Sequence, residues 1–155
     1  MPAAIRHARV PDDLDEIRSL FEEYAGSLDF DLGFQGFAEE LADLPGDYAD
    51  PDGALLLACD QRGALGCVAL RRLDAATCEM KRLYVRPAGR GQRLGRRLAA
   101  AIIDQARRRG YKAMRLDTAP GMAEAIALYR SLGFAPIAPY RHNPLDGALF
   151  FELTL

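Results

Sequence analysis

Hydrophobic and polar positions alternate along the chain in two periods, one typical of amphipathic helices and one typical of strands. The clearest helix lies between Leu94 and Gly110, where apolar residues recur at every fourth position. The clearest strand is the apolar run of residues 54–60, which a glycine-containing turn joins to a second run, so the two predict a hairpin. The whole pattern predicts strands at residues 4–9, 54–60, 64–73, 77–85, 113–118, 134–137 and 148–155, and helices at residues 11–26, 37–44, 94–110 and 122–132.

This order of elements predicts a mixed, mostly antiparallel central sheet of about seven strands flanked by about four helices, in the α/β (α+β) class. The helix at residues 94–110 joins the strands at residues 77–85 and 113–118, and such a crossover predicts that these two strands are parallel. The chain has 155 residues and shows no internal repeat or linker, so we expect one domain, residues 1–155.

Composition narrows the class of protein. Half of the residues are hydrophobic and 27% are charged, the ordinary balance of a soluble globular protein. No apolar run approaches the roughly 20 residues of a membrane span, and the N-terminus has no signal-peptide pattern, so we expect a cytoplasmic protein. Cys59, Cys67 and Cys78 lack metal-binding spacing, and we expect core residues in a reducing compartment and no metal site.

Charge is distributed unevenly. Residues 81–112 contain eleven Lys and Arg against one acid, whereas residues 1–60 contain fifteen acids and three Arg. The imbalance suggests an anionic ligand near the basic segment and a cationic one near the acidic segment, unless both are simply solvated helix faces. A nucleic-acid module is disfavoured because aromatic residues do not interleave with the basic ones, and a P-loop because no Gly-Lys-Ser/Thr follows the glycines.

The junction between the strand at residues 77–85 and the next helix is the strongest candidate for an anion site. Its turn and first helical residues include Gly89, Arg90, Gly91, Arg93, Gly95 and Arg96. A helix N-terminus presents unpaired N–H groups and the positive end of the macrodipole. We therefore expect a phosphate-bearing ligand here.

Two motifs carry a family resemblance. The first is Leu83-Tyr84-Val85-Arg86-Pro87 followed by Arg90-Gly91-Gln92-Arg93-Leu94-Gly95, and the second is Leu128-Tyr129-Arg130-Ser131-Leu132-Gly133-Phe134. In this order and spacing, the chain resembles the Gcn5-related N-acetyltransferase (GNAT) superfamily over essentially its whole length. The resemblance implies an acyl-CoA N-acyltransferase fold with splayed central strands, and transfer of an acetyl group from acetyl-CoA to an amine.

The resemblance also implies which residues hold the cofactor. The amides of residues 91–96 are expected to bind the CoA pyrophosphate, and Leu83 and Val85 to pair with the pantetheine arm across a gap opened by a bulge. The full set is Leu83, Tyr84, Val85, Arg90, Gly91, Gln92, Arg93, Leu94, Gly95, Arg96 and Tyr129. Two positions depart from the family pattern: Arg93 replaces a loop glycine, and Met122 stands where many relatives have Asn.

Acetyl transfer needs a neutral amine, a stabilised oxyanion and a proton for the departing thiolate. Glu79 is the leading base, unless it is only solvated or paired with Lys81 or Arg82; Glu22 is the reserve together with Glu23. Tyr129 is the leading acid, with a core tyrosine as the alternative, and the backbone N–H of Leu83 is the expected oxyanion donor.

The acceptor is expected to be a primary amine of a small molecule, an amino-acid-like compound or a peptide. The loop residues Asp29, Phe30, Asp31 and Phe34 are expected to suit its cation, and Arg141 its carboxylate. Glu22 is also expected to contact the acceptor, and His142 is either a further contact or a surface residue. No nucleic acid or membrane partner is expected, and the protein is taken as a monomer or homodimer. A CoA-binding sensor without transfer activity is the alternative function.

Overall fold

The computed structural model describes residues 2–28, 31–119 and 121–155, and its elements follow the predicted order. The strands are β1 (Ala4–His7), β2 (Ala54–Asp60), β3 (Gly63–Arg72), β4 (Thr77–Val85), β5 (Ala113–Thr118), β6 (Ala135–Ile137) and β7 (Leu149–Thr154). The α-helices are α1 (Leu14–Gly26), α2 (Phe37–Ala42), α3 (Leu94–Arg108) and α4 (Ala123–Ser131). Three short 3-10 helices are η1 (Leu32–Gln35), η2 (Gly46–Tyr48) and η3 (Pro87–Gly89).

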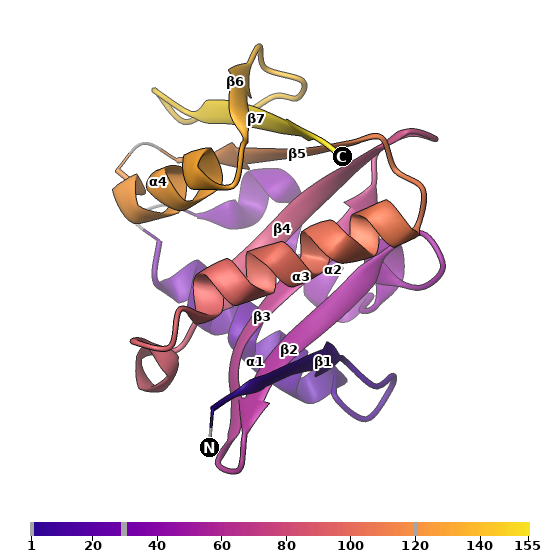
Figure 1. Ribbon diagram of the computed structural model, residues 1–155, viewed down its shortest axis with the longest axis vertical. Coiled ribbons are helices and arrows are strands. Elements are labelled where there is room, and N and C mark those ends of the chain that lie inside the picture. Colours follow the sequence, from indigo (N-terminus) through magenta and orange to yellow (C-terminus); the bar gives the residue numbers. More distant parts are fainter. Residues whose placement is uncertain (1, 29–30, 120) are drawn as a thin grey trace.

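The seven strands form one sheet in the order β1-β2-β3-β4-β5-β7-β6, as Figure 1 shows. Neighbouring strands are antiparallel except β4 and β5, which are parallel and joined by α3. The prediction of a mixed, mostly antiparallel seven-stranded sheet with four helices is confirmed, including the parallel pair.

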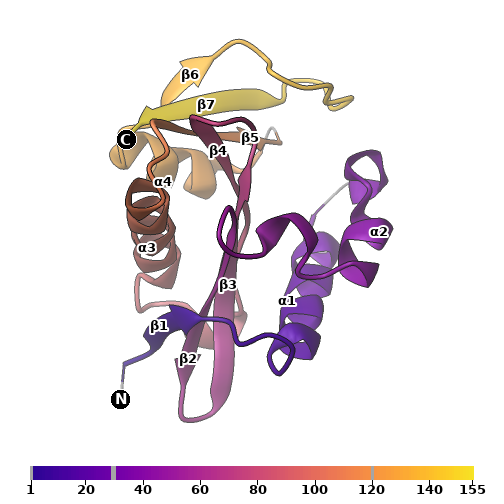
Figure 2. The ribbon, with the colours of Figure 1, turned by 90° about the vertical axis from the view of Figure 1, so that its right-hand side faces the viewer.

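Helices cover both faces of the sheet, with α3 and α4 on one face and α1 and α2 on the other (Figure 2). Each face has its own apolar core. On α3 the stripe that begins with Leu94 and Leu98 is buried, and on α1 the buried residues include Ile17 and Phe21. The strands between these two cores are buried on both faces, which explains the unbroken apolar run of β2. No helix in the described ranges is both long and apolar enough to cross a bilayer.

The structure refines the loop between α1 and α2 and several element ends. The Asp31 carboxylate accepts a hydrogen bond from the Gly33 N–H at 2.7 Å and starts the helix η1 in a segment predicted as loop. The helix predicted at residues 37–44 ends at Ala42, and the one predicted at residues 122–132 begins at Ala123. These shifts lie within the fraying expected of helix ends.

Part of the uneven charge is neutralised inside the molecule. Arg82 on β4 pairs with Glu40 on α2 at 2.8 Å, and Arg86 at the end of β4 pairs with Glu16 and Glu23 on α1 at 2.7 and 2.8 Å. The basic central strand and the acidic first helices thus attract one another, which holds α1 and α2 against the same face of the sheet.

Candidate active site

The central feature is a splay between the parallel strands β4 and β5. They pair only where Thr77–Glu79 faces Ala113–Arg115, although β4 continues to Val85. On the other edge of β4 the register with β3 shifts, because Lys81 pairs with Ala69 whereas Tyr84 pairs with Cys67. The extra residue is accommodated at Arg82, which has a φ of 61°. The expected bulge and splay are therefore both present.

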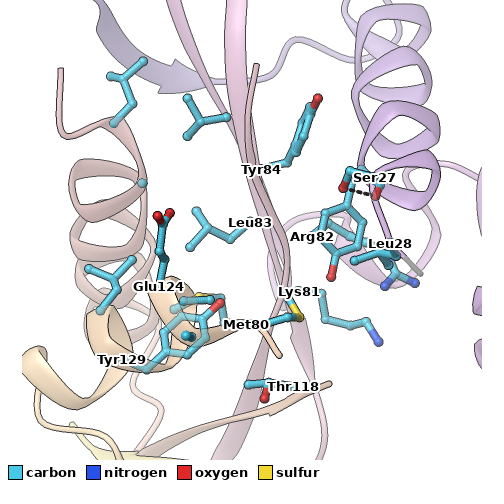
Figure 3. A pocket seen from close by; sticks show the side chains of 18 of the residues that line it. Ser27, Leu28, Met80, Lys81, Arg82, Leu83, Tyr84, Thr118, Glu124 and Tyr129 are labelled. Carbon is cyan, nitrogen blue, oxygen red and sulfur yellow. Dashed lines mark hydrogen bonds between the residues drawn. The ribbon is translucent and has the colours of Figure 1, made fainter. Parts of the chain in front are cut away.

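The splay opens into a cleft of about 880 Å³. On the side of α3 and α4 its lining includes Leu83, Leu94, Gly95, Leu128 and Tyr129, and we call this the α3–α4 wall. On the opposite side its lining includes Tyr24, Ser27, Gln35, Lys81, Arg82 and Asp117, and we call this the α1–α2 wall. In Figure 3, Leu83 and Tyr129 lie across β4 from Lys81 and Ser27.

One end of the cleft is a turn that suits a diphosphate. The first N–H groups of α3 have no intrahelical acceptor and point out of the helix beside Gly95, which lines the cleft. Gly91 has a φ of 90°, and no atom lies within 4 Å of the place where its Cβ would be, so the backbone is accessible to a ligand. Arg93 adopts a φ of 55° as the N-cap of α3, so it takes the left-handed conformation that the family's glycine would supply.

The side chains of this turn divide into those that face the cleft and those that hold the turn. Arg90 lines the cleft. The Gln92 Oε1 accepts a hydrogen bond from the Ala3 N–H at 3.1 Å, and Arg97 donates to the Ala3 carbonyl at 2.6 Å. Arg96 donates to the Ser131 hydroxyl at 2.7 Å, which links α3 to α4. Backbone amides with Arg90 beside them are thus the groups that fit a pyrophosphate.

Leu83 and Tyr129 both line the α3–α4 wall of the cleft. Because of the bulge, Leu83 has no residue opposite it in the registers of β3 and β5. The Tyr129 ring reaches from α4 toward β4 (Figure 3) and packs edge-on against Phe134, with 5.8 Å between ring centroids. Burial raises the pKa of Tyr129, so its phenol keeps its proton at neutral pH. A protonated hydroxyl and a strand position without a partner in the sheet therefore lie on the same wall of the cleft.

Glu79, the predicted base, lies behind the cleft rather than in it. Its side chain is 0% exposed, and its carboxylate accepts hydrogen bonds from Arg71 Nε at 2.7 Å, Tyr140 Oη at 2.6 Å and Arg141 at 2.6 Å. Burial opposes its ionisation, but these cations, Lys81 and the Tyr140 hydrogen bond outweigh burial and lower the pKa of Glu79. A carboxylate already bound by three donors does not fit the role of proton acceptor.

The predicted acceptor residues are mostly not in the cleft. Arg141 is bound to Glu79, so it does not offer its guanidinium to a substrate carboxylate. Glu22 on α1 and His142 in the loop before β7 are exposed, and neither belongs to the lining of the cleft. Asp29, Phe30 and the side chain of Phe34 lie outside the described part of the chain. Glu22, Arg141 and His142 therefore lie outside the lining of this cleft, and their expected contacts with an acceptor stay predictions.

Other polar residues line the α1–α2 wall instead. Lys81, Tyr24, Gln35 and Asp117 line the cleft, and the Asp117 carboxylate accepts a hydrogen bond from Asn143 Nδ2 at 3.2 Å. The sequence could have indicated Lys81. Glu79 and Lys81 alternate along a strand predicted to be central, and charged residues are rarely buried unless they are paired. Tyr24 and Asp117 carried no such signal. Among the described residues, no three or more His, Cys, Asp or Glu side chains gather as a metal site would require.

Comparison with known proteins agrees with this geometry. A model of the acetyltransferase (GNAT) family matches residues 14–134. The chain is 41% identical over 154 residues to an uncharacterized N-acetyltransferase of Schizosaccharomyces pombe, covering 98% of this chain and 94% of the relative. It is 34% identical over 154 residues to an IAA acetyltransferase of Azospirillum brasilense, covering 97% and 95%.

A solved structure that has the same fold contains the acetyl donor. The crystal structure of a GNAT superfamily phosphinothricin acetyltransferase from Sinorhizobium meliloti in complex with AcCoA superposes with a TM-score of 0.72 at 21% identity, covering 100% of this chain and 89% of that one. The splayed sheet, the diphosphate turn and the matching family model lead to one conclusion: the chain belongs to the GNAT family and is an N-acetyltransferase that uses acetyl-CoA.

Proposed function

We propose that the enzyme acetylates a primary amine of a small-molecule or amino-acid-like acceptor, by direct attack within a ternary complex. The observation that supports this acceptor class is the polar α1–α2 wall, where the carboxylate of Asp117 lies in the same cleft as the hydroxyls of Tyr24 and Ser27. One Asp117 oxygen is bound by Asn143, and the other remains for an ammonium group. An acceptor held on this wall faces the α3–α4 wall directly, so no covalent enzyme intermediate is needed.

Two groups in the middle of the cleft are proposed to do chemistry. The Leu83 N–H stabilises the oxyanion that develops at the acetyl carbonyl, since it lies at the bulge where strand pairing is interrupted. Tyr129 gives its phenolic proton to the departing sulfur. Its raised pKa keeps the proton in place until a thiolate forms beside it in the same buried space.

Measuring CoA release with a panel of amines, amino acids and short peptides tests the acceptor class. Small primary amines and amino acids are expected to be turned over, while peptides and secondary amines are not. Initial velocities at varied concentrations of both substrates are expected to give intersecting lines. Parallel lines would point to a covalent intermediate, and tight CoA binding without turnover of any amine would refute the acceptor assignment.

The acid role of Tyr129 is tested by Tyr129→Phe, which keeps the ring and removes the proton. We expect kcat to fall by about 10²–10⁴-fold, the usual contribution of a positioned acid or base, with CoA affinity unchanged. Tyr111→Phe is the matched control, because the Tyr111 hydroxyl donates to the Asp52 carbonyl at 2.7 Å and does not line the cleft. Full activity of Tyr129→Phe would remove Tyr129 from the mechanism.

A further inference from the structure

Lys81 is a lysine buried on the α1–α2 wall. Its side chain is 4% exposed, and it lies on the far side of β4 from Leu83 (Figure 3). Its Nζ donates a hydrogen bond to Gln35 Oε1 at 2.9 Å, and the nearest carboxylate oxygen, on Glu79, is 4.0 Å away. The Lys81 amine thus lines the cleft, and among the described residues its ion-pair partner is Glu79 at 4.0 Å.

Charged residues from several elements surround Lys81, and two of the acids, Glu79 and Glu40, are bound by arginines. On β3 and in the loop before β7, Arg71 and Arg141 bind Glu79, while on β4 Arg82 binds Glu40 of α2. On β5, Asp117 lines the same cleft and is bound by Asn143. A protonated Lys81 would add a positive charge beside three guanidinium groups.

The amine is therefore easily deprotonated. Burial disfavours the charged form, Glu79 partly offsets this, and Arg82, Arg141 and Arg71 disfavour the charged form further, so the pKa of Lys81 falls to about 7. The hydrogen bond to Gln35 uses an N–H of the amine, which leaves the lone pair of a neutral Lys81 available to accept a proton.

We propose that Lys81 is the proton acceptor of the transfer reaction, its neutral amine taking a proton from the ammonium group of the acceptor in the cleft. The inference rests on the proposed function, because it requires an amine acceptor on the α1–α2 wall. It assigns to Lys81 the role expected of Glu79, which acts instead as a positioning residue that fixes the guanidinium groups around Lys81.

Acetyl transfer by this route conserves protons and electron pairs. The acceptor ammonium loses one proton to Lys81 Nζ, and its freed lone pair forms the C–N bond to the acetyl carbon of acetyl-CoA. The C–S bond breaks, and the sulfur keeps that electron pair and takes the proton of Tyr129. Tyr129 recovers a proton from the newly bonded nitrogen, and Lys81 releases the first proton to water.

The need for a proton acceptor follows from the ordinary pKa of an alkylammonium, about 10.4, at which only about 1 in 2,500 molecules is neutral at pH 7. A base is most effective when its own pKa lies near the working pH. Glu79 holds its charge too strongly and is enclosed by three donors, whereas Lys81 meets both the position and the protonation requirement.

The first test reads the protonation state of Lys81 without any acceptor. The chain has two lysines, Lys81 and Lys112, and Lys112 is exposed. With ¹³C label at the ε-carbon of lysine, NMR titration of the whole protein is expected to show two signals, assigned by Lys81→Met. The signal that is lost in Lys81→Met should titrate between about pH 6 and 8, around the lowered pKa of Lys81. A Lys81 signal that stays in the charged form up to pH 9 would overturn the proposal.

The second test uses an amine that the wild-type enzyme acetylates. Lys81→Met removes the base, and Lys81→Arg keeps a permanent charge; for both we expect kcat/KM at pH 7 to fall at least 100-fold with CoA affinity unchanged. The deficit should shrink about tenfold per pH unit between pH 7 and 9.5, because the acceptor amine then becomes neutral without help. Lys112→Met is the matched control and should keep wild-type activity.

These outcomes separate the proposed role of Lys81 from the proposed acceptor class on which it rests. A deficit of the same size at every pH would mark Lys81 as a structural residue and overturn its role, while the acceptor class stands. If the wild-type enzyme binds CoA but acetylates no amine, the acceptor class fails and the role of Lys81 fails with it.

Discussion

Leu83, Leu94 and Leu128 present aliphatic side chains to the α3–α4 wall of the cleft, whereas Gln35, Lys81 and Arg82 present hydrogen-bonded polar groups to the α1–α2 wall. Packing and backbone geometry shape the first wall, and buried charges shape the second. Both walls include residues of β4, because the bulge at Arg82 interrupts the alternation of side chains and turns Leu83 to the opposite face from Lys81. The same strand therefore contributes to an apolar wall and to a charged wall, and the two should respond differently to mutation and pH.

The largest effect is expected from Glu79→Gln, which alters the buried carboxylate behind the charged wall. This change leaves the partly buried guanidinium groups of Arg71 and Arg141 without this carboxylate, and breaking such pairs costs up to about 3–5 kcal/mol of unfolding free energy. Urea unfolding at pH 7 measures it. Because the pKa of Glu79 is lowered in the folded state, its stabilisation is complete above about pH 4.5, its ordinary range, and is lost as pH falls through the folded value.

The difference between wild type and Glu79→Gln should therefore narrow in acid. Glu152→Gln is the matched control, since Glu152 pairs with Arg115 at 2.8 Å where both side chains are partly exposed to solvent. That change should cost about 1 kcal/mol or less. Equal losses in the two variants would mean that the burial of Glu79 does not make its ion pairs more stabilising than the exposed pair of Glu152.

A somewhat smaller loss is expected on the apolar side from Leu98→Ala. Leu98 is buried in the core between α3 and the sheet, and its truncation should cost about 2–4 kcal/mol through lost packing. No ionisable group is altered, so the loss should be the same at pH 5 and pH 8 in urea unfolding. A loss that varied with pH by more than about 1 kcal/mol would contradict the division between a packed wall and a charged wall.

The smallest effect is expected from Gly91→Ala, in the turn before α3. A residue with a Cβ is strained at a φ of 90°, so we expect CoA affinity to fall by about 5- to 30-fold, which corresponds to about 1–2 kcal/mol. Isothermal titration with CoA measures the change. Gly63→Ala is the control, because Gly63 has a φ of 122° in the β2–β3 turn, where strain should lower stability but leave CoA affinity intact.

The fold and the α3–α4 wall could be predicted because their determinants are local. The apolar stripe of α3, the glycines of the turn and the Leu128-Tyr129 motif each lie within a few residues of one another. Even Arg93, a departure from the family pattern, did not disturb this prediction, since its backbone takes the conformation that a glycine would take.

The α1–α2 wall could not be predicted in the same way because its contacts join distant segments. Glu79 is 61 and 62 positions from Tyr140 and Arg141, which bind it, and Lys81 is 46 positions from Gln35. Residue type alone offers Glu79 as a base and Arg141 as a carboxylate binder. The structure shows that these two side chains bind each other, which argues against both roles. It also shows that Lys81 faces the cleft.

The hydrogen bonds from Ala3 to Gln92 and from Arg97 to Ala3 join the edge strand β1 to the turn before α3. Ordering of the turn by a bound diphosphate and docking of β1 on the sheet are therefore thermodynamically linked, and each must favour the other by the same free energy. We therefore expect that a change which loosens β1 also lowers the affinity of the chain for CoA.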